Sequence, residues 1–361
     1  MPTYRFSVEL SESLPMHPDE TPIQPAELRT FVSDLFQKTG MPSSDADSTA
    51  EVLVGTDLRG IFSHGTRLAP NYLKHILDGH MKAHPQPKVE RETPAMAVVD
   101  ADRGIGHLAA RDGMQRAIEK ARQVGVGMVN VRRSHHLGAA SIYAMQALAH
   151  GMIGFTTTNT GGPSVAPFGG RDSALANHPL AWAFPTREGF PIVIDTAAGV
   201  AAWQRVETMR IYGQKLPPDW CLDKEGNPTD DPAEAFIMFP AGGTRGYGLA
   251  VAAGLLAGAL SGGQVPSRRE RYNAATDSEH TFTAISIERF VSREQFLGEV
   301  DEMIAACHRT PPRDGFERVC LPGELEWERE QQWRENGIPL HRDHLTLLAE
   351  IADRLGVKVF W

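Results

Sequence analysis

The chain has 361 residues, of which 41% are hydrophobic, and a formal net charge of −9. A chain of this length and composition can bury a large core, in one large domain or in two interlocked ones. Its acidic balance argues against nucleic-acid binding, which needs a clustered basic surface. Cys221, Cys307 and Cys320 are too few and too scattered for a disulfide framework or a cysteine-rich zinc site. We therefore expect a protein of the reducing cytoplasm.

No segment has the pattern of a signal peptide or of a membrane anchor. The first 20 residues lack an apolar core of the necessary length, and the most apolar run, residues 247–262, is too short to span a bilayer. This run is rich in Gly and Ala, which let another helix approach closely, so it predicts a buried packing helix or a subunit-interface helix. Arg268, Arg269 and Arg271 lie among acidic residues and are predicted to form a solvated face.

The N-terminal part is expected to be helical. Residues 1–24 are polar and contain several prolines, which indicates a surface arm. Three helices are then predicted: one over residues 25–40, one that follows Ser43 or Ser44 and runs to residue 58, and one over residues 66–80. Pro25 is expected in the first turn of the first helix, and Ser43 or Ser44 is expected to cap the second.

From about residue 95 the pattern changes to alternating strands and helices. Six strands are expected, over residues 95–101, 126–133, 152–159, 180–185, 190–196 and 280–290. The amphipathic helix at 108–125 joins the first two strands at a spacing that suits a βαβ unit. A last amphipathic helix is predicted at 341–357. The sequence thus predicts an α/β fold in three parts: an arm (1–24), a mainly helical portion (25–95 plus 310–361) and a helix-covered sheet domain (96–309).

A glycine pattern between the first strand and its helix imitates a dinucleotide fingerprint. Gly104-x-Gly106-x-x-Ala109 has the spacing of a Rossmann phosphate turn. The strand that follows, VGMVNVRRSHH, lacks the acidic residue that would hold the ribose. The pattern therefore favours a tight turn into a packed helix over a Rossmann site.

Two Ser-His clusters are candidates for a polar site assembled from distant parts of the chain. Ser63 and His64 lie between two glycines, and His136 ends a second cluster, RRSHH. Asp195 closes an apolar run, a place where strand ends often carry site residues. Taken singly, His64 could be a buried hydrogen-bonded histidine and Asp195 a helix cap.

Seven stretches resemble one enzyme family in the same order along the chain. They are DLRGIFSHGTR, SHHLGAASIY, TNTGGPSVAPFGG, HPLAWAFP, DWCLDKEGNPTDDP, RGYGLAVAAGLLAG and LPGE. The chain resembles, over roughly residues 25–355, the malate/L-lactate dehydrogenase family of the second type. Members include ureidoglycolate, sulfolactate and diketogulonate dehydrogenases and cyclic imino-acid reductases. The resemblance implies a non-Rossmann α/β fold that binds NAD or NADP in an extended form, usually as a homodimer with sites near the subunit interface.

The resemblance also implies roles for individual residues. It places catalysis on His64 and His136, with Ser63 and Asp195 as their partners. It implies a cofactor-binding set of Thr160, the Ile194-Asp195-Thr196 turn, Arg245, Gly246, Pro322, Gly323 and Glu324. Reducing a carbonyl needs a hydride on carbon and a proton on oxygen, and histidine can supply the proton because its pKa is near neutral. No metal site is expected, since the histidines have no ligand spacing.

Several positions depart from the family pattern. The family arginine five residues after the SHG serine is Leu68 here, so Arg67 is the nearest cation for a substrate carboxylate. If that stretch is helical, the one-residue shift rotates the side chain by about 100°. The usual TNP motif is Asn177-His178-Pro179 here, and the added imidazole makes His178 a second candidate for substrate binding. Gly199 replaces a serine, and Arg245 replaces a lysine.

The sequence therefore predicts an NAD(P)-dependent oxidoreductase that interconverts a small 2-hydroxy acid and its 2-oxo acid. Two alternatives stay open: a reductase of a cyclic imino acid, and a catalytically silent relative that only binds ligands. The expected partners are a small carboxylate substrate and a second copy of the chain, without nucleic acid or membrane. The substrate, the choice of NAD or NADP and the direction are not specified by the sequence.

Overall fold

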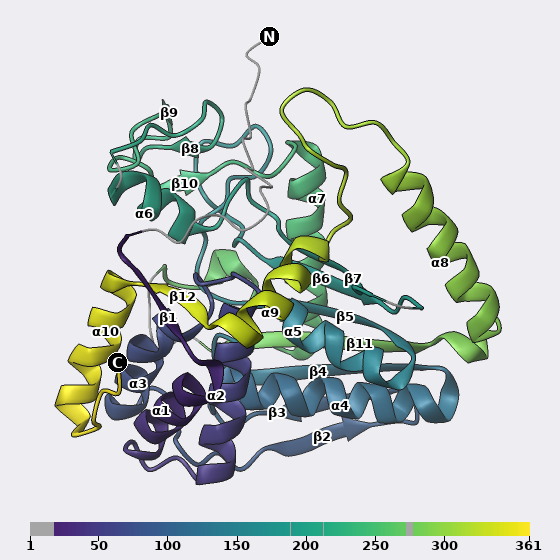
Figure 1. The fold of residues 1–361 in the computed structure, drawn as a ribbon, viewed down its shortest axis with the longest axis horizontal. Coiled ribbons are helices and arrows are strands. Elements are labelled where there is room, and N and C mark those ends of the chain that lie inside the picture. Colours follow the sequence, from purple (N-terminus) through teal and green to yellow (C-terminus); the bar gives the residue numbers. More distant parts are fainter. Residues whose placement is uncertain (1–17, 188, 212, 272–276) are drawn as a thin grey trace.

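A seven-stranded mixed sheet forms the centre of the protein (Figure 1). The computed structural model describes residues 18–187, 189–211, 213–271 and 277–361. The strands of this sheet are β2 Lys88–Glu92, β3 Met96–Asp100, β4 Val126–Ser134, β5 Met152–Asn159, β6 Pro179–Phe184, β7 Ile192–Ala197 and β11 Ser278–Ser286. They lie in the order β2-β3-β4-β11-β5-β6-β7, with β3 and β4 parallel and the other neighbours antiparallel. The predicted α/β fold and its six predicted strands are confirmed.

One face of the sheet is covered by α4 (Gly106–Val124) and α5 (Ser141–Ala144). The helix α4 joins the parallel strands β3 and β4, as the spacing predicted. At its start, a Cβ on Gly106 would lie 2.1 Å from the His135 carbonyl oxygen. A side chain would therefore prevent this close approach, so the glycine belongs to a tight turn into a packed helix.

The other face is covered by α7 (Thr244–Ala253), which continues into the π-helix η3 (Gly254–Gly258). The Leu256 carbonyl accepts hydrogen bonds from Asn130 on β4 and Thr281 on β11, both at 3.0 Å. The run predicted to be a packing or interface helix thus packs on the sheet along one side.

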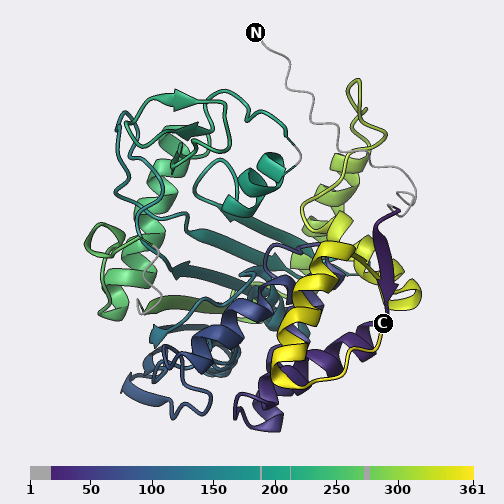
Figure 2. The same cartoon turned by 90° about the vertical axis from the view of Figure 1, so that its left-hand side faces the viewer.

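Both ends of the chain build a helical unit beside the sheet (Figure 2). Its elements are β1 Glu20–Ile23, α1 Pro25–Gln37, α2 Ser43–Leu58, η1 Thr66–Leu68, α3 Ala69–Leu77, β12 Ile338–His341 and α10 Arg342–Leu355. They share one core, in which Phe36, Leu53 and Leu348 are fully buried. Residues 1–17 of the expected arm lie outside the described residues, and residues 20–23 pair with β12.

Two local predictions for these helices have different outcomes. Pro25 stands in the first turn of α1, as expected. The cap predicted at Ser43 or Ser44 is wrong, because Ser43 is already helical and no side chain caps α2. Pro42 precedes the helix with φ −55° and ψ 144°, so its fixed φ starts the helix directly at the next residue.

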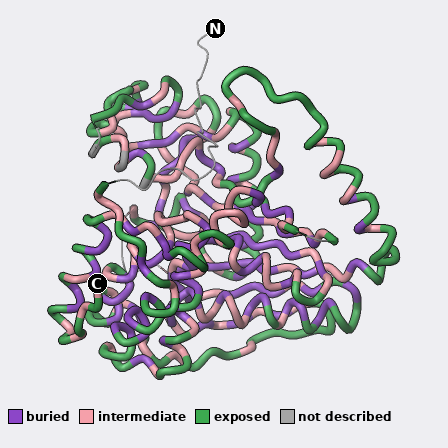
Figure 3. Tube along the Cα trace, in the orientation of Figure 1, coloured by how far each residue is buried: buried purple, intermediate pink, exposed green. Residues whose placement is uncertain are grey.

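The remaining elements lie at the periphery. They are α6 Trp203–Ile211, α8 Arg293–His308, α9 Glu324–Asn336, a small sheet of β8 Cys221–Leu222, β9 Pro228–Thr229 and β10 Ile237–Met238, and the short turns η2 Met145–His150, η4 Ala259–Ser261, η5 Pro266–Arg268 and η6 Ile287–Arg289. Figure 3 shows α8 largely exposed at the rim, and only its Leu297 and Val300 are buried. Within the described ranges, no helix has the length and apolarity needed to cross a membrane.

The solvated face predicted at residues 268–271 is wrong for Arg269. This side chain is buried, forms an ion pair with buried Glu279 and donates to the Asn159 carbonyl at 3.1 Å. The Arg271 guanidinium stacks 4.0 Å from the centre of the Phe236 ring. Neighbouring acidic residues did not indicate solvent exposure here, because Glu279, the acid that pairs with Arg269, is itself buried at the end of the sheet.

Candidate active site

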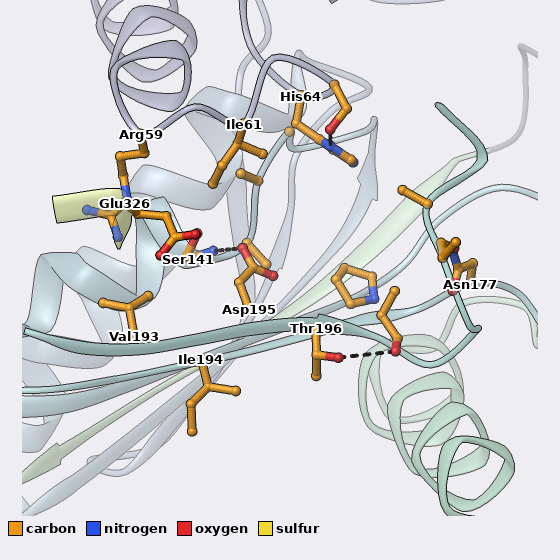
Figure 4. A pocket seen from close by; sticks show the side chains of 18 of the residues that line it. Arg59, Ile61, His64, Ser141, Asn177, Val193, Ile194, Asp195, Thr196 and Glu326 are labelled. Carbon is orange, nitrogen blue, oxygen red and sulfur yellow. Dashed lines mark hydrogen bonds between the residues drawn. The ribbon is translucent and has the colours of Figure 1, made fainter. Parts of the chain in front are cut away.

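A cavity of about 950 Å³ opens between the sheet and the helical unit. Its walls come mainly from the segment after α2 (59–68), the segment after β4 (136–141), the end of β5, the residues of β7 and beyond (193–203), and the start of α9 (320–326). Figure 4 shows part of this wall, where side chains from separate segments converge. Ser63, His64 and His136 all line it, so the structure brings the two Ser-His clusters together.

Ser63 and His64 lie in a turn that closes over Asp57. The Ser63 hydroxyl is 2.8 Å from His64 Nδ1. Asp57, in the last turn of α2, accepts hydrogen bonds from the Thr66 backbone N–H at 3.0 Å and from the Thr66 hydroxyl. A Cβ on Gly65 would lie 1.9 Å from Asp57 Oδ1. The glycine therefore permits the contact that fixes this turn, and burial raises the pKa of the Asp57 carboxyl to about 7.

Two hydrogen bonds to Nδ1 orient the ring of His136. The Gly138 backbone N–H donates to His136 Nδ1 at 3.3 Å, and the Tyr72 hydroxyl lies 2.6 Å from the same nitrogen. A backbone N–H can only donate, so Nδ1 is bare in the neutral ring and Nε2 carries the proton. Tyr72 therefore also donates to Nδ1. It is buried on α3 and is a site residue that the sequence did not predict.

The two imidazoles lie close together on the cavity wall, and both are partly buried. Their ring centroids are 5.6 Å apart with an interplanar angle of 30°. Burial lowers the pKa of His64, and burial together with the neighbouring histidines lowers the pKa of His136 well below its usual value. Both rings are therefore neutral at neutral pH. In the part of the chain that the structure describes, no group of three or more His, Cys, Asp or Glu side chains could hold a metal ion.

Asp195 lies within β7, not in a turn as the resemblance implied, and it lines the cavity. It accepts a hydrogen bond from the Ser141 backbone N–H at 3.0 Å, and Figure 4 shows Ile194 pointing to the other side of the strand. Its hydrogen bond thus goes to Ser141 rather than to an imidazole. Desolvation raises the pKa of this carboxyl, while Ser141 and, more weakly, the positive charge of Arg59 oppose the rise.

Arg59 is a wall residue that sequence reasoning did not single out, although it lies in the DLRG stretch. It is only 2% exposed and pairs with Glu330 at 3.0 Å. Among the described residues that line the cavity, it is the one Lys or Arg. Glu326 and Asp195 line the same region, and Figure 4 shows the three side chains near one another. The cavity thus has a guanidinium set among carboxylates.

Arg67 and His178, the two residues predicted to bind substrate, do not line the cavity. Leu68 lines the cavity, whereas Arg67 is not among the lining residues. The pKa of Glu207 on α6 is lowered by its hydrogen bond to Arg210 and, less strongly, by the charge of Arg67. Burial and the charge of Arg67 lower the pKa of His344 on α10, so Arg67 lies near both helices. His178 is fully buried next to Gly254 of the π-helix, and burial lowers its pKa to about 4.

Most of the predicted cofactor-binding residues lie on the wall. Those that line the cavity are Thr160, Ile194, Asp195, Thr196, Pro322 and Gly323. Arg245 is exposed on α7 and does not line it, and Gly246 is a packing position where a Cβ would lie 2.4 Å from the Ala241 nitrogen. Glu324 is buried and accepts a hydrogen bond from the Leu321 N–H at 2.9 Å. It therefore closes the turn before α9.

This wall fits a nicotinamide dinucleotide. The cavity is at the upper end of the range for ligand pockets, about 300–1,000 Å³. Gly323 has φ 91° and a Cβ there would lie 2.7 Å from the Val193 nitrogen, so the turn packs against β7 only without a side chain. The first turn of the helix that follows carries Glu324 and Glu326, which oppose an anionic group there, whereas the Asp195 carboxylate can accept hydrogen bonds from ribose hydroxyls.

Two departures from the family pattern compensate each other. The Gly199 N–H donates to Asn177 Oδ1 at 2.7 Å, and Asn177 Nδ2 donates to the Ala201 carbonyl at 2.8 Å. A Cβ on Gly199 would lie 2.8 Å from Asn177 Oδ1. The missing side chain at 199 thus makes room for the amide that holds this part of the wall.

Comparison with known proteins identifies the family of the chain. A family model described as malate/L-lactate dehydrogenase matches residues 23–349. The malate dehydrogenase of Pyrococcus abyssi is 38% identical over 343 residues, which cover 92% of this chain and 94% of that protein. The L-sulfolactate dehydrogenase of Methanocaldococcus jannaschii is 36% identical over 343 residues, which cover 93% and 98%.

Solved structures give the same result at the level of the fold. The sulfolactate dehydrogenase structure from Methanocaldococcus jannaschii superposes with a TM-score of 0.86 at 34% identity, covering 94% of this chain and 98% of that one. The structure of delta1-piperideine-2-carboxylate reductase from Pseudomonas syringae pvar. tomato superposes with a TM-score of 0.83 at 25% identity, covering 92% and 100%. The chain therefore belongs to the malate/L-lactate dehydrogenase family, whose members are oxidoreductases that act on CH–OH groups with a nicotinamide cofactor.

Proposed function

We propose that this protein interconverts a small 2-hydroxy acid and its 2-oxo acid, with NAD or NADP as the hydride carrier. The observation that best supports it is the pair of neutral imidazoles, His64 and His136, on a wall that also fits the cofactor. The malate and sulfolactate dehydrogenases among its relatives are named for 2-hydroxy acids. The three free cysteines support a reducing, cytoplasmic location.

The bound cofactor would accept or supply the hydride, and the residues of the wall would handle the proton. Tyr72 and Gly138 occupy His136 Nδ1, so Nε2–H is left to donate to the substrate oxygen. The Ser63 hydroxyl can pair with either tautomer of His64, so His64 can accept or release a proton at its own Nε2. Burial lowers the pKa of both rings, so both are neutral before reaction. In oxidation, His64 would take the hydroxyl proton at Nε2 and become an imidazolium, which would return the proton in reduction. His136, whose Nε2 is already protonated, would only donate a hydrogen bond to the substrate oxygen.

Arg59 is our candidate for binding an anionic group of the ligand. Its guanidinium lies in the wall and is desolvated, where a charged hydrogen bond is worth more than in water. The acids around it disfavour a second negative charge at the same place. We therefore expect a substrate with a single carboxylate to be preferred over a dicarboxylate.

The test is a screen of 2-oxo acids with NADH and NADPH, followed by variants. Replacing His64 or His136 with Ala is expected to lower kcat by about 10²-fold or more, the usual loss for a general acid or base. His84→Ala, at an exposed histidine, is the matched control and should leave kcat unchanged. Near-normal kcat in either active-site variant would remove that histidine from the mechanism.

A reductase of a cyclic imino acid is the second candidate. The similarity to the Pseudomonas reductase favours it, because a C=N bond needs the same hydride and the same proton donor. Adding cyclic imino acids to the screen separates the two, since only one substrate class should be turned over efficiently. Quenching of tryptophan fluorescence by NADH without turnover of either class would instead indicate a silent ligand-binding relative.

A further inference from the structure

We infer that His280 is a positioning residue for His136, because it ties residues 134–136 to Thr158 on the cavity wall. The inference rests on the proposed function, in which His136 donates to the substrate oxygen. His280 lies on β11, is fully buried and lies outside the cavity lining.

The sheet alone does not hold the segment that carries His136. Pairing between β4 and β11 runs regularly from Val126↔Ile285 to Val131↔His280, and then the register shifts before Ser134↔Ser278. Within this irregularity Arg133 has φ 49°, the left-handed region that non-glycine residues rarely adopt. The backbone therefore leaves the ladder just before His136 and needs another support.

The imidazole of His280 provides that support. Its Nε2 lies 3.1 Å from the His135 carbonyl oxygen and 3.0 Å from the Ser134 hydroxyl. A carbonyl can only accept, so Nε2 carries the proton and donates to the backbone next to His136. Burial lowers the pKa of His280 to about 3, so this neutral ring and its tautomer persist across the working pH range.

The other nitrogen of the ring contacts the cavity wall. The Thr158 hydroxyl lies 2.7 Å from Nδ1 and 3.0 Å from the Glu279 carbonyl oxygen. Since Nε2 holds the proton, Nδ1 can only accept, so the hydroxyl donates across the shorter of these two contacts. Thr158 is the direct cross-strand neighbour of His280 and lines the cavity. One rigid ring thus spans from the wall at β5 to the His135 carbonyl, so a change at either end moves the other.

Two substitutions separate the two contacts. In His280→Gln the side-chain amide reaches about as far as Nε2 and can still donate to the His135 carbonyl. In His280→Asn the shorter amide stays near the Nδ1 position, so it keeps a partner for Thr158 and loses the donor to His135. Thr281→Val is the control, because Thr281 is a buried neighbour on the same strand whose hydroxyl donates to Leu256 on the opposite face of the sheet.

For the substrate found by the screen, we expect His280→Asn to lower kcat about 10- to 100-fold, the usual effect of a displaced reacting group, with little change in the KM of the cofactor. His280→Gln should stay within about threefold of the wild type, because the supporting hydrogen bond persists. Thr281→Val should behave like the wild type. Equal losses in the Asn and Gln variants, in step with their melting temperatures, would show that His280 is only structural.

A spectroscopic measurement tests the inference independently of turnover. In protein labelled with ¹⁵N-histidine, His280 is expected to show a protonated Nε2 and a bare Nδ1. The His136 signals should shift in His280→Asn and stay in place in His280→Gln. Unchanged His136 signals in both variants, or a His280 proton on Nδ1, would overturn the assignment. If the wild type turns over no substrate, the proposed function fails while this measurement still decides the role of His280.

Discussion

Gly65 follows His64 and lies against the Asp57 carboxylate. Gly65→Ala would place a Cβ 1.9 Å from Asp57 Oδ1, so the turn that carries Ser63 and His64 must move. Overpacking of this kind costs about 1–3 kcal/mol, and a shift of the ring away from the substrate is expected to lower kcat by about 10-fold or more. Steady-state kinetics and thermal unfolding measure both effects.

The control for this substitution is Gly55→Ala in the preceding helix. No atom lies within 4 Å of a Cβ built on Gly55, and alanine is the better helix former. This variant should keep its kcat and unfold at the same or a higher temperature. If Gly65→Ala behaved in the same way, the turn would tolerate a side chain and Asp57 would not fix it.

Arg67 and Arg59 offer a comparison between two guanidinium groups near the same turn. Arg59 lines the cavity and Arg67 does not. Losing a charged hydrogen bond costs about 1.5–3 kcal/mol, so Arg59→Lys should lower kcat/KM roughly 10- to 150-fold. Arg67→Lys should change it less than about threefold, because Arg67 does not line the cavity.

The opposite ranking would restore Arg67 as the carboxylate clamp that the sequence suggested. In that case the side chain would have to turn into the cavity when the substrate binds. Lysine keeps the charge in both variants, so the comparison tests the planar guanidinium rather than the presence of a cation. Thermal unfolding of Arg59→Lys checks that the contact with Glu330 survives.

At the scale of secondary structure, the end of β5 is held by the buried pair Arg269–Glu279. Arg269 donates to the Asn159 carbonyl, and Asn159 in turn donates to Glu279 at 2.6 Å. Removing one partner of a buried pair leaves an uncompensated charge, so Arg269→Met is expected to destabilise the protein by about 3–5 kcal/mol. The double variant Arg269→Met/Glu279→Met should lose less than the single variant, because no lone charge remains.

Chemical denaturation of these variants measures the difference. Arg187→Met serves as the control, because Arg187 forms an exposed ion pair with Glu294 and its loss should leave stability nearly unchanged. A double variant that is less stable than Arg269→Met would show that packing, rather than charge compensation, dominates at this end of the sheet.

The sequence predicted the bounds of helices and strands most accurately where the hydrophobic pattern was strongly periodic. The strand β5 matches its predicted bounds of 152–159, and α4 and α10 lie within two residues of theirs. The helices α8 and α9 were not predicted, because their apolar residues do not follow a clear stripe. In α8 only Leu297 and Val300 are buried, and in α9 only Glu324 is buried.

The site also contains residues that the sequence predicted and residues that it did not. The two Ser-His clusters were visible because polar residues interrupted apolar patterns. Tyr72 and His280 could not be found in this way, since each lies within an otherwise regular helix or strand and acquires its role only from a partner distant in sequence. The burial of Arg269 was missed for the same reason, because it depends on contacts with Glu279 and Asn159 that form only in the folded protein.

At the scale of the whole molecule, the outer side of the α7–η4 region is a candidate for the dimer interface. Four leucines there are exposed: Leu249 by 43%, Leu255 by 52%, Leu256 by 37% and Leu260 by 59%. Single exposed leucines are common, but four within one helical segment favour a covered surface. We propose that a second copy covers it, and that Leu255→Glu shifts the protein toward the monomer in sedimentation equilibrium.

Leu77 gives the matched control, because it is exposed by 55% at the end of α3, away from the α7–η4 region. Leu77→Glu should leave the sedimentation profile unchanged. A wild-type protein that sediments as a monomer would remove the proposal, and equal effects of the two substitutions would show that added charge alone causes the change.

The pairing of β1 with β12 has a consequence for synthesis on the ribosome. Ile23 pairs with Ile338, and the core around α1 and α2 is completed by side chains of α10. The first helices therefore leave the ribosome long before the strand and helix that cover them are translated. Their apolar surfaces stay exposed while the sheet is made, which is the condition under which chaperones bind nascent chains and under which aggregation begins.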